Sequence, residues 1–382
     1  MPTPPPATMR AAILAEDRLE VREIATPVPE PGEALLRVSA CGVCHTDLHV
    51  MKGEVRFPRP AVLGHEVSGS IVAIGAGTAD TRTLRVGDRV AAGFIMPCGT
   101  CAQCARDRDD LCTEFFRRNR LEGTLYDGRS RLAMPDGSFL AMYSMGGLAE
   151  YAVVPLTALT SLDDDLDLDT ACILGCSGLT SYGAVFRAGA VAPGMSVAIV
   201  GVGGIGTSLI PMTRAAGAER IVAIDIAQEK LARAKDLGAT DVVDAAREDP
   251  VARVRELTGG VDVAFEALGR PATFAQAVGM LADGGRMVAI GIAAGAAAAE
   301  VEITPLVRRG QQIIGSFGAR TRTDLPQVAA LAASGSFDPA DLVSRRYTLD
   351  EADEAYRALS RGEITGRAII TMSAARAAEE QE

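Results

Sequence analysis

The stretch that decides the fold is SVAIVGVGGIGTSLI, residues 196–210. Gly201, Gly203 and Gly206 stand in it at the spacing G-x-G-x-x-G, with an apolar run before them and a helical pattern after them. The first glycine permits a tight turn, the second lets a pyrophosphate approach the backbone, and the third lets the helix pack closely on the strand. The stretch therefore predicts a strand, a turn and a helix that bind a dinucleotide. The alternative is an ordinary strand–helix turn.

The next apolar run along the chain, RIVAID, ends in Asp225. This carboxylate follows the last glycine of the fingerprint at the distance typical of dinucleotide-binding folds. It would accept hydrogen bonds from the adenosine ribose hydroxyls and repel a 2′-phosphate. We therefore expect NAD as the cofactor, with NADP as the less favoured alternative.

Outward from this stretch, the sequence has two textures. From about residue 170 to 315, helical patterns such as QEKLARAKDLGA alternate with apolar runs, which predicts a parallel α/β sheet. Residues 10 to about 160 hold short Val/Ile/Leu runs broken by Gly and Pro, which predicts a barrel-like domain of short antiparallel strands. Residues 113–147 are expected to form a long surface loop, for which a subunit contact is one candidate role. Residues 317–372 predict a helix (DEADEAYRALSRG) and a final strand (RAIITM).

Composition excludes several classes of protein. The chain has 382 residues and a formal net charge of −11, whereas a nucleic-acid-binding protein usually needs a basic face. No apolar run reaches the roughly 18 residues of a membrane-spanning helix. The first ten residues, MPTPPPATMR, carry no apolar core of a secretory signal, so we expect a cytoplasmic protein.

Four of the eight cysteines are crowded into CGTCAQCARDRDDLC. Cys98, Cys101, Cys104 and Cys112 have the spacing C-x2-C-x2-C-x7-C, which suits one tetrahedral zinc ion in a closed structural site. Disulfides are the first alternative and are disfavoured without a secretory signal. An iron–sulfur cluster is the second, although the proline that usually follows its last cysteine is absent. Ordinary buried cysteines without a metal are the third alternative, and the polar residues between the cysteines disfavour it.

The three histidines of the chain, His45, His49 and His65, all lie within 21 positions and beside a second C-x2-C pair, Cys41 and Cys44. A catalytic zinc site has about three protein ligands of mixed nitrogen and sulfur type and an open position. Cys44, His65 and a distant third thiolate would supply such a site.

These motifs occur together in one order: GVCHTD, GHE-x-x-G, the four-cysteine segment, GCSGLTSYGA and GxGGxG. In this the chain resembles the zinc-dependent medium-chain alcohol dehydrogenases over residues 10–372. The resemblance implies an α/β protein with a GroES-like β-barrel catalytic domain and a Rossmann domain with a doubly wound parallel sheet. It places the first part of the catalytic domain at 1–177, with 1–9 as a disordered tail, the NAD-binding domain at 178–316, and the return to the catalytic domain at 317–382.

The resemblance implies a catalytic zinc site with Cys44, His65 and Cys176 as ligands. Glu66 would lie near the metal and join it transiently, and Asp47 would orient the ligand histidine. The alternative for Glu66 and Asp47 is a generic buried salt bridge. Cys41 and Cys172 match no ligand position and are expected to be small buried residues.

The same resemblance implies a proton relay and a set of cofactor contacts. Thr46 would bond the substrate oxygen and His49 would pass the proton to the surface, the alternative being a solvated, structural His49. The implied cofactor contacts are His45 and Arg367 near the pyrophosphate, Thr180 and Ile205 against the nicotinamide, Lys230 near the adenosine ribose, and in addition Gly204, Ile290 and Ile292. Phe94 would form part of the pocket wall.

The implied activity is hydride transfer between an alcohol and NAD, with two zinc ions per subunit, one catalytic and one structural. Arg117, Arg118 and Arg120 would meet a carboxylate or a CoA phosphate at the pocket mouth, or else form a solvated charged loop. The stretch NRLEGTLYDGRSRL resembles a branch of the family that contains semialdehyde reductases, which implies an acidic semialdehyde as a substrate. The alternatives are an NADPH-dependent carbonyl reductase, a zinc-bearing C=C reductase and a non-enzymatic cofactor-binding protein. The long loop resembles that of homodimeric members, with a tetramer as the alternative.

Overall fold

The computed structural model describes residues 4–78, 84–293 and 295–372, and it divides the chain into two compact units. The first unit takes its residues from Met1–Leu179, Arg320–Ala333 and Val343–Glu382, and the second from Thr180–Ala319 and Ser334–Leu342. The sequence placed the return to the first domain at 317, whereas Ser334–Leu342 belongs to the second unit. The helix expected near the end is α9 (Ala352–Ser360), and the final strand is β18 (Arg367–Thr371).

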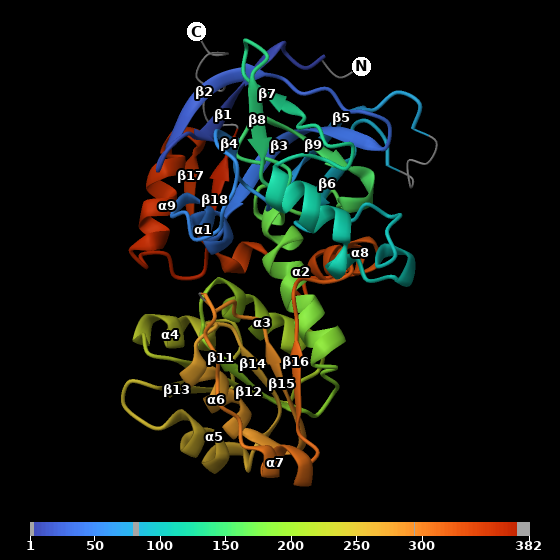
Figure 1. Cartoon of the computed structure of the whole chain (residues 1–382). Coiled ribbons are helices and arrows are strands. Elements are labelled where there is room, and N and C mark those ends of the chain that lie inside the picture. Colours follow the sequence, from blue (N-terminus) through green and yellow to red (C-terminus); the bar gives the residue numbers. More distant parts are fainter. Residues whose placement is uncertain (1–3, 79–83, 294, 373–382) are drawn as a thin grey trace. The chain divides into compact units, whose positions relative to one another are not determined.

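The first unit is built on two sheets (Figure 1). The five-stranded sheet has the order β2 (Leu19–Ala25), β1 (Thr8–Leu14), β4 (Ala61–Val62), β8 (Phe139–Met142) and β7 (Leu132–Ala133). The seven-stranded sheet has the order β10 (Leu159–Ser161), β6 (Arg89–Ala92), β5 (Val67–Ile74), β3 (Glu33–Val43), β18 and β17 (Val343–Thr348), with β9 (Tyr151–Pro155) also paired to β3. Most pairs are antiparallel, as the sequence predicts, but β4–β8 and β17–β18 are parallel.

Few α-helices accompany these sheets in the described residues. Besides α9, they are α1 (His45–Met51), α8 (Thr321–Ala333) and α2 (Ser177–Tyr182). The boundary between the two units falls within α2. Strand β3 binds the unit together because it pairs with β5, β9 and β18, which come from three distant parts of the sequence.

Two expectations for the first unit are wrong. The tail expected at 1–9 includes Thr8 and Met9, which begin β1 opposite Ala25 and Ile24, and Met9 is only 1% exposed. Residues 1–3 of that tail lie outside the described residues. The segment 113–147, expected to be a loop, contains the π-helix η3 (Phe115–Glu122) and strands β7 and β8. Its apolar side chains find partners in distant strands, which local polarity does not reveal.

The second unit holds six parallel strands in the order β13 (Asp241–Asp244), β12 (Arg220–Asp225), β11 (Ser196–Val200), β14 (Val261–Glu266), β15 (Leu281–Ala289) and β16 (Gln312–Gly315). Its helices are α3 (Gly204–Ala215), α4 (Gln228–Asp236), α5 (Pro250–Thr258), α6 (Pro271–Gly279) and α7 (Ile303–Arg308) (Figure 1). This is the doubly wound order: the chain adds strands to one side of β11 first, and then crosses over and adds β14 and the later strands to its other side. The predicted α/β fold with a Rossmann-type sheet is confirmed.

The buried core of this sheet includes Val200, Val222, Ala264 and Met287, which come from four neighbouring strands. Because both faces of a parallel sheet are covered, its strands are apolar throughout, and this explains why runs such as RIVAID stand out in the sequence.

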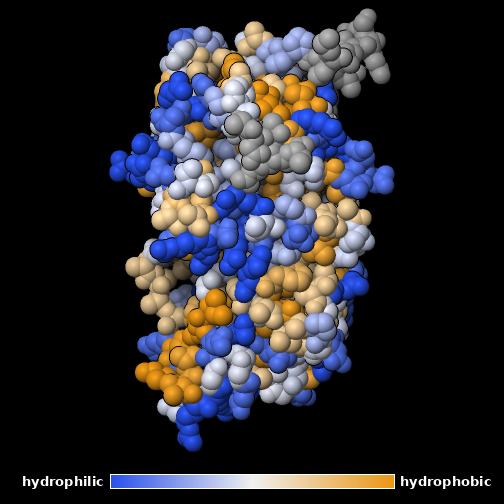
Figure 2. Space-filling model, turned by 90° about the vertical axis from the view of Figure 1, so that its right-hand side faces the viewer, coloured by the Kyte–Doolittle hydropathy of each residue, from blue (hydrophilic) through white to orange (hydrophobic). Residues whose placement is uncertain are grey.

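One edge of the second unit is apolar. Strand β16 has only β15 as a neighbour among the described residues, and α7 has no buried residue. The exposed apolar residues are Ile303 and Val307 on α7, Ile313 on β16, and Ile292 after the end of β15. Figure 2 shows hydrophobic surface gathered on this unit. Over the residues searched, no helix is long and apolar enough to cross a membrane.

Candidate active site

Four buried side chains of the first unit converge on one point. Cys44, His65, Glu66 and Cys176 each offer one ligand atom, and these atoms all lie within 4.8 Å of one another. Cys44 lies at the junction of β3 and α1, His65 and Glu66 immediately precede β5, and Cys176 immediately precedes α2. The pairing of β3 with β5 brings the first three together, since Cys41 lies opposite Val67.

Asp47 holds the imidazole ring of His65. Its Oδ2 lies 3.0 Å from His65 Nδ1 and accepts a hydrogen bond from the Tyr356 hydroxyl, also at 3.0 Å. Its Oδ1 accepts a hydrogen bond from the Gly64 N–H at 3.1 Å. Neither ring nitrogen of His65 makes a hydrogen bond among the described residues, so the contact of Asp47 with Nδ1 is an ion pair. A carboxylate on one ring nitrogen fixes the tautomer and leaves the other nitrogen free as a ligand.

Glu66 is held by Arg367. Arg367 donates a hydrogen bond to Glu66 Oε1, and the two side chains are 5% and 0% exposed. Glu66 Oε2 is buried without a partner among the described residues. A side chain at position 42 would overlap Glu66, so Gly42 leaves the room that this carboxylate occupies. In this structure Arg367, which the resemblance placed near the cofactor pyrophosphate, has Glu66 as its ion-pair partner.

The electrostatics of the cluster favour a thiolate at Cys44. A hydrogen bond from Cys176, together with the charge of His65, holds the pKa of Cys44 well below its usual value. Burial lowers the pKa of His65, but Asp47 and the Cys44 thiolate outweigh burial and raise it to about 10. Because metal ligands must be deprotonated, a cation that binds here displaces the imidazolium proton.

The donor set fits a zinc ion. A thiolate, a free imidazole nitrogen and a second thiol are the mixed nitrogen and sulfur ligands of catalytic zinc. The unpartnered Nε2 of His65 and the unpartnered Oε2 of Glu66 are buried polar atoms whose desolvation a bound cation would compensate. Cys44, His65 and Cys176 therefore form a candidate zinc site, with Glu66 within reach.

A second candidate metal site lies in the first unit. The sulfur atoms of Cys98, Cys101, Cys104 and Cys112 lie within 4.8 Å of one another. Backbone N–H groups donate to two of them, from Cys98 to Cys112 Sγ and from Cys101 to Cys98 Sγ, both at 3.3 Å. All eight cysteines of the chain are free thiols, so the disulfide alternative is wrong. Four cysteine sulfurs this close together suit a closed tetrahedral zinc site.

An ion pair ties this four-cysteine segment to helix α8. Arg322 donates to the buried carboxylate of Asp109 at 2.7 Å and to the carbonyl oxygen of Cys104 at 2.6 Å. The guanidinium fork thus contacts the segment at two points, which fixes its orientation on the unit.

In the second unit the glycine turn has the expected form. Gly201 has φ +93° between β11 and α3, a conformation that favours glycine. A side chain at Gly206 would overlap the carbonyl of Gly201, so the third glycine allows the close approach of helix and strand. Asp225 lies beside this turn, and its Oδ2 accepts the Val202 N–H at 2.8 Å.

The structure places the remaining predicted residues as follows. Thr46 lies 3.6 Å from Cys44, measured from Oγ1 to Sγ, and His49 is exposed and pairs with Glu54. Thr180 is buried, Gly203, Gly204, Ile205, Lys230 and Ile290 are half-buried, and His45 and Ile292 are exposed. Although His45 is exposed as a whole residue, the groups around its imidazole partly desolvate the ring and lower its pKa. Cys41 and Cys172 are buried, and Phe94 packs edge-on to His65 with ring centres 6.0 Å apart.

Comparison with known proteins matches both parts of the chain. Residues 30–164 match the alcohol dehydrogenase GroES-like domain, and residues 204–334 match the zinc-binding dehydrogenase family. An alcohol dehydrogenase from Geobacillus stearothermophilus is 33% identical over 95% of this chain and 99% of its own length. The chain belongs to the zinc-binding medium-chain alcohol dehydrogenase family.

Solved structures of the family agree with this membership. Benzyl alcohol dehydrogenase from Acinetobacter calcoaceticus is 32% identical, with a TM-score of 0.88, over 96% of this chain and 99% of that one. Acetophenone reductase from Geotrichum candidum (26% identity, TM-score 0.78, 97% and 99% covered) was solved with NAD. A structure from Sinorhizobium meliloti (27% identity, TM-score 0.78, 96% and 100% covered) was solved with NADP.

Sequence reasoning missed two supporting residues of this dehydrogenase. Tyr356, on α9, holds Asp47 from more than 300 positions away, and no local pattern announces it. Glu266, at the end of β14, is fully buried and accepts hydrogen bonds from Leu268 N and Gly269 N at 3.0 Å and from the Thr273 hydroxyl at 2.7 Å. An acid that closes the strand VDVAFE directly after the apolar residues 263–265 is the signal that would have found Glu266.

The three arginines of the dehydrogenase's η3 segment differ in their surroundings. Arg117 pairs with Glu114 at 2.7 Å and Arg118 with Glu122 at 2.9 Å, both on partly exposed side chains. These two fit the expectation of a solvated charged surface. Arg120 instead places its guanidinium carbon 4.1 Å from the centre of the buried Tyr143 ring.

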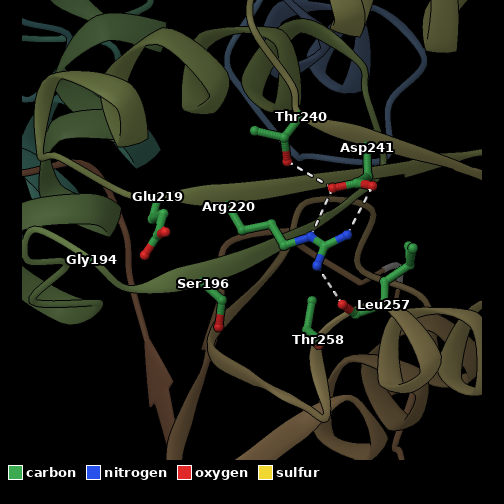
Figure 3. A pocket seen from close by; sticks show the side chains of 8 residues that line it. All are labelled: Gly194, Ser196, Glu219, Arg220, Thr240, Asp241, Leu257 and Thr258. Atoms are coloured by element: carbon green, nitrogen blue, oxygen red, sulfur yellow. Dashed lines mark hydrogen bonds and ion pairs between the residues drawn. The ribbon is translucent and has the colours of Figure 1, made fainter.

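A pocket of about 490 Å³ lies in the second unit, away from the glycine turn. It is lined by Gly194, Ser196, Glu219, Arg220, Thr240, Asp241, Leu257 and Thr258, at the amino ends of β11, β12 and β13 (Figure 3). Dinucleotides bind at the carboxyl ends of such strands. Arg220 forms an ion pair with Asp241 and donates a hydrogen bond to the Leu257 carbonyl oxygen. The lining residues named here therefore include no unpaired positive charge for a ligand.

Proposed function

We propose that this protein is a zinc- and NAD-dependent dehydrogenase that interconverts an alcohol and the corresponding aldehyde or ketone, with an acidic semialdehyde as its carbonyl substrate. The observation that carries the reaction class is the buried cluster of Cys44, His65, Glu66 and Cys176. When bound there, zinc supplies a Lewis acid that lowers the pKa of an alcohol or polarises a carbonyl.

The residues of the candidate active site in the first unit each have a role in this proposal. Cys44, His65 and Cys176 hold the metal, and Asp47 keeps the His65 ring in its ligand orientation. Thr46 takes up or delivers the proton of the substrate hydroxyl. It lies on α1, about one helical turn before His49. His49 exchanges that proton with solvent, which its 48% exposed side chain permits.

NAD is the proposed cofactor. The turn at Gly201–Gly206 leaves room for a diphosphate, and Asp225 stands beside it with a negative charge that disfavours a 2′-phosphate. Family members were solved with NAD and with NADP, so the choice depends on the residues of this chain. The rest of the proposal is a cytoplasmic homodimer with two zinc ions per subunit.

The experiment follows nicotinamide oxidation by zinc-loaded protein with a panel of aldehydes, using NADH and NADPH in parallel at neutral pH. The proposal expects carbonyl reduction, a preference for NADH, and loss of activity in Cys176→Ser together with a loss of one zinc per chain by metal analysis. A preference for NADPH would contradict the role given to Asp225.

The same panel separates the rival functions. Reduction of a conjugated C=C bond with no carbonyl reduction would favour a C=C reductase. Binding of NADH without turnover of any substrate would favour a non-enzymatic, cofactor-binding protein.

A further inference from the structure

Arg120 is the one arginine of η3 whose charge has no carboxylate partner within the described parts of the chain. Arg117 and Arg118, on the same helical segment, are each paired with a glutamate. Nε of Arg118 and Nη1 of Arg120 are both buried without a hydrogen-bond partner in the described residues, but Arg118 has the Glu122 carboxylate for its charge. Since buried charged groups are nearly always paired, Arg120 marks a position where a partner is missing.

Aromatic rings hold Arg120 in place. Its guanidinium carbon lies 4.1 Å from the centre of the Tyr143 ring and 5.7 Å from that of Phe115. Such contacts attract a cation to the face of the ring, but the ring accepts no hydrogen bond from N–H groups in the plane of the guanidinium. The N–H groups of the guanidinium can therefore still donate hydrogen bonds to a planar group with two oxygens, such as a carboxylate.

The backbone beside Arg120 is fixed. The neighbouring Asn119 is fully buried, and its Nδ2 donates to the carbonyl oxygens of Ser144 at 2.8 Å and Thr124 at 3.3 Å. Because the segment is tied at these points, the arginine is presented in a set position, as a preorganised binding residue requires.

Arg120 is close to the candidate zinc site. The Tyr143 ring, on which the guanidinium lies, packs edge-on to His65 with ring centres 6.4 Å apart. The guanidinium carbon is thus no more than about 10.5 Å from the His65 ring centre, the 6.4 Å and 4.1 Å distances laid end to end. Phe57 and Phe94 line the same aromatic surroundings, through contacts to Tyr143 and His65.

We propose that Arg120 binds the carboxylate of the substrate, and that the substrates are short-chain oxo acids with the carbonyl at one end and the carboxylate at the other. The inference rests on the proposed function, because it needs the carbonyl at the zinc site. It names Arg120, and neither Arg117 nor Arg118, as the residue that selects the substrate class. A single unpaired cation matches the single charge of a carboxylate, whereas a phosphate monoester carries nearly two charges.

The first test compares matched substrates on the zinc-loaded wild-type protein. 4-Oxobutanoate, 5-oxopentanoate and 6-oxohexanoate are each compared with a neutral aldehyde of equal length, beginning with pentanal for 4-oxobutanoate. A charge-assisted hydrogen bond to the carboxylate predicts a kcat/KM about 10- to 100-fold higher for the best acid than for its neutral counterpart. The acid that reacts best reports the distance from the zinc site to Arg120.

The second test uses Arg120→Gln, with Arg117→Gln as the matched control. We expect R120Q to lose about 10- to 100-fold in kcat/KM for the acid and to change by less than threefold for the neutral aldehyde. R117Q, which removes an exposed and paired arginine, is expected to leave both values unchanged. Arg120→Lys keeps the charge without the fork and is expected to lie between R120Q and the wild type.

The outcomes are distinct. Equal kcat/KM for acids and neutral aldehydes in the wild type, or equal losses for both in R120Q, would overturn the inference and leave the proposed dehydrogenase activity standing. No turnover of any aldehyde by the zinc-loaded protein would refute the proposed function itself. If R120Q does not fold, the wild-type comparison and R120K decide the question.

Discussion

Asp47 illustrates how single residues set the chemistry of this molecule. Its two oxygens serve His65 Nδ1, the Tyr356 hydroxyl and the Gly64 N–H, and the side chain is fully buried. A buried carboxylate with this many partners fixes the ring that it contacts.

The first prediction concerns this carboxylate. Asp47→Asn is expected to lower zinc affinity and kcat each by about 10- to 100-fold, because the ring of His65 loses its charged partner. Zinc content after dialysis against a weak chelator and steady-state kinetics measure the two effects. Tyr356→Phe, which removes one hydrogen bond and keeps the carboxylate, serves as the control and should bind zinc nearly as well as the wild type. An unchanged zinc affinity in D47N would refute this role.

The second prediction concerns the choice of cofactor. Asp225→Asn is expected to raise kcat/KM with NADPH by about tenfold or more, because a like charge beside the 2′-phosphate costs several kcal/mol. The asparagine oxygen can still accept the Val202 N–H, so the turn should keep its stability. Initial rates with NADH and NADPH check the expectation, and thermal unfolding checks the turn. No gain with NADPH would mean that other residues decide the preference.

At the scale of secondary structure, β16 is an incomplete element. It is the last strand of the parallel sheet, and its pattern is mostly exposed. An edge strand presents unpaired backbone N–H and carbonyl groups and is a ready template for pairing with another chain. Together with the exposed apolar residues of α7, it is the best place in the second unit for the expected homodimer contact.

The third prediction follows from this edge. The wild-type chain is expected to sediment as a dimer, and Val307→Arg with Ile313→Arg is expected to yield monomers, since two buried charges would oppose association. Val28→Arg changes an exposed apolar residue of the first unit and is the control; Val28 is 77% exposed, against 71% for Val307 and 37% for Ile313. Analytical ultracentrifugation gives the mass. A double variant that remains dimeric would place the contact elsewhere, and a tetrameric wild type would require a second contact.

At the scale of the whole molecule, the metals and the cofactor are expected in different units. Both candidate zinc sites lie within Met1–Leu179, and the glycine turn with Asp225 lies in the second unit. Ligands that bind only the folded state stabilise the unit that they bind, by about 4 kcal/mol at a thousand times the dissociation constant.

The fourth prediction uses this division. Stripping zinc with a strong chelator is expected to lower the unfolding temperature of the first unit, whereas NADH is expected to raise that of the second. Differential scanning calorimetry with and without each ligand measures both changes. Cys104→Ser should respond to the chelator less than the wild type, because one site is already broken. An unfolding curve unaffected by the chelator would argue against structural zinc.

The features that depend on short spacings could be predicted from the sequence alone. The glycine turn, the four cysteines within fifteen positions and the strand–helix alternation are local, so few chain conformations are compatible with them. The four cysteines duly converge, and the doubly wound sheet is present. Cys176 needed the resemblance to a family, because it lies more than 100 positions from its partners.

The partner of each charged group is visible only in the folded chain. Arg367 pairs with Glu66, and Tyr356 supports Asp47. Arg120 has no acid among the described residues, although its neighbours Arg117 and Arg118 each have one. The tertiary structure also brought Met9 into a strand. These outcomes depend on packing between distant segments, in which many weak contacts add up, and no local pattern carries that sum.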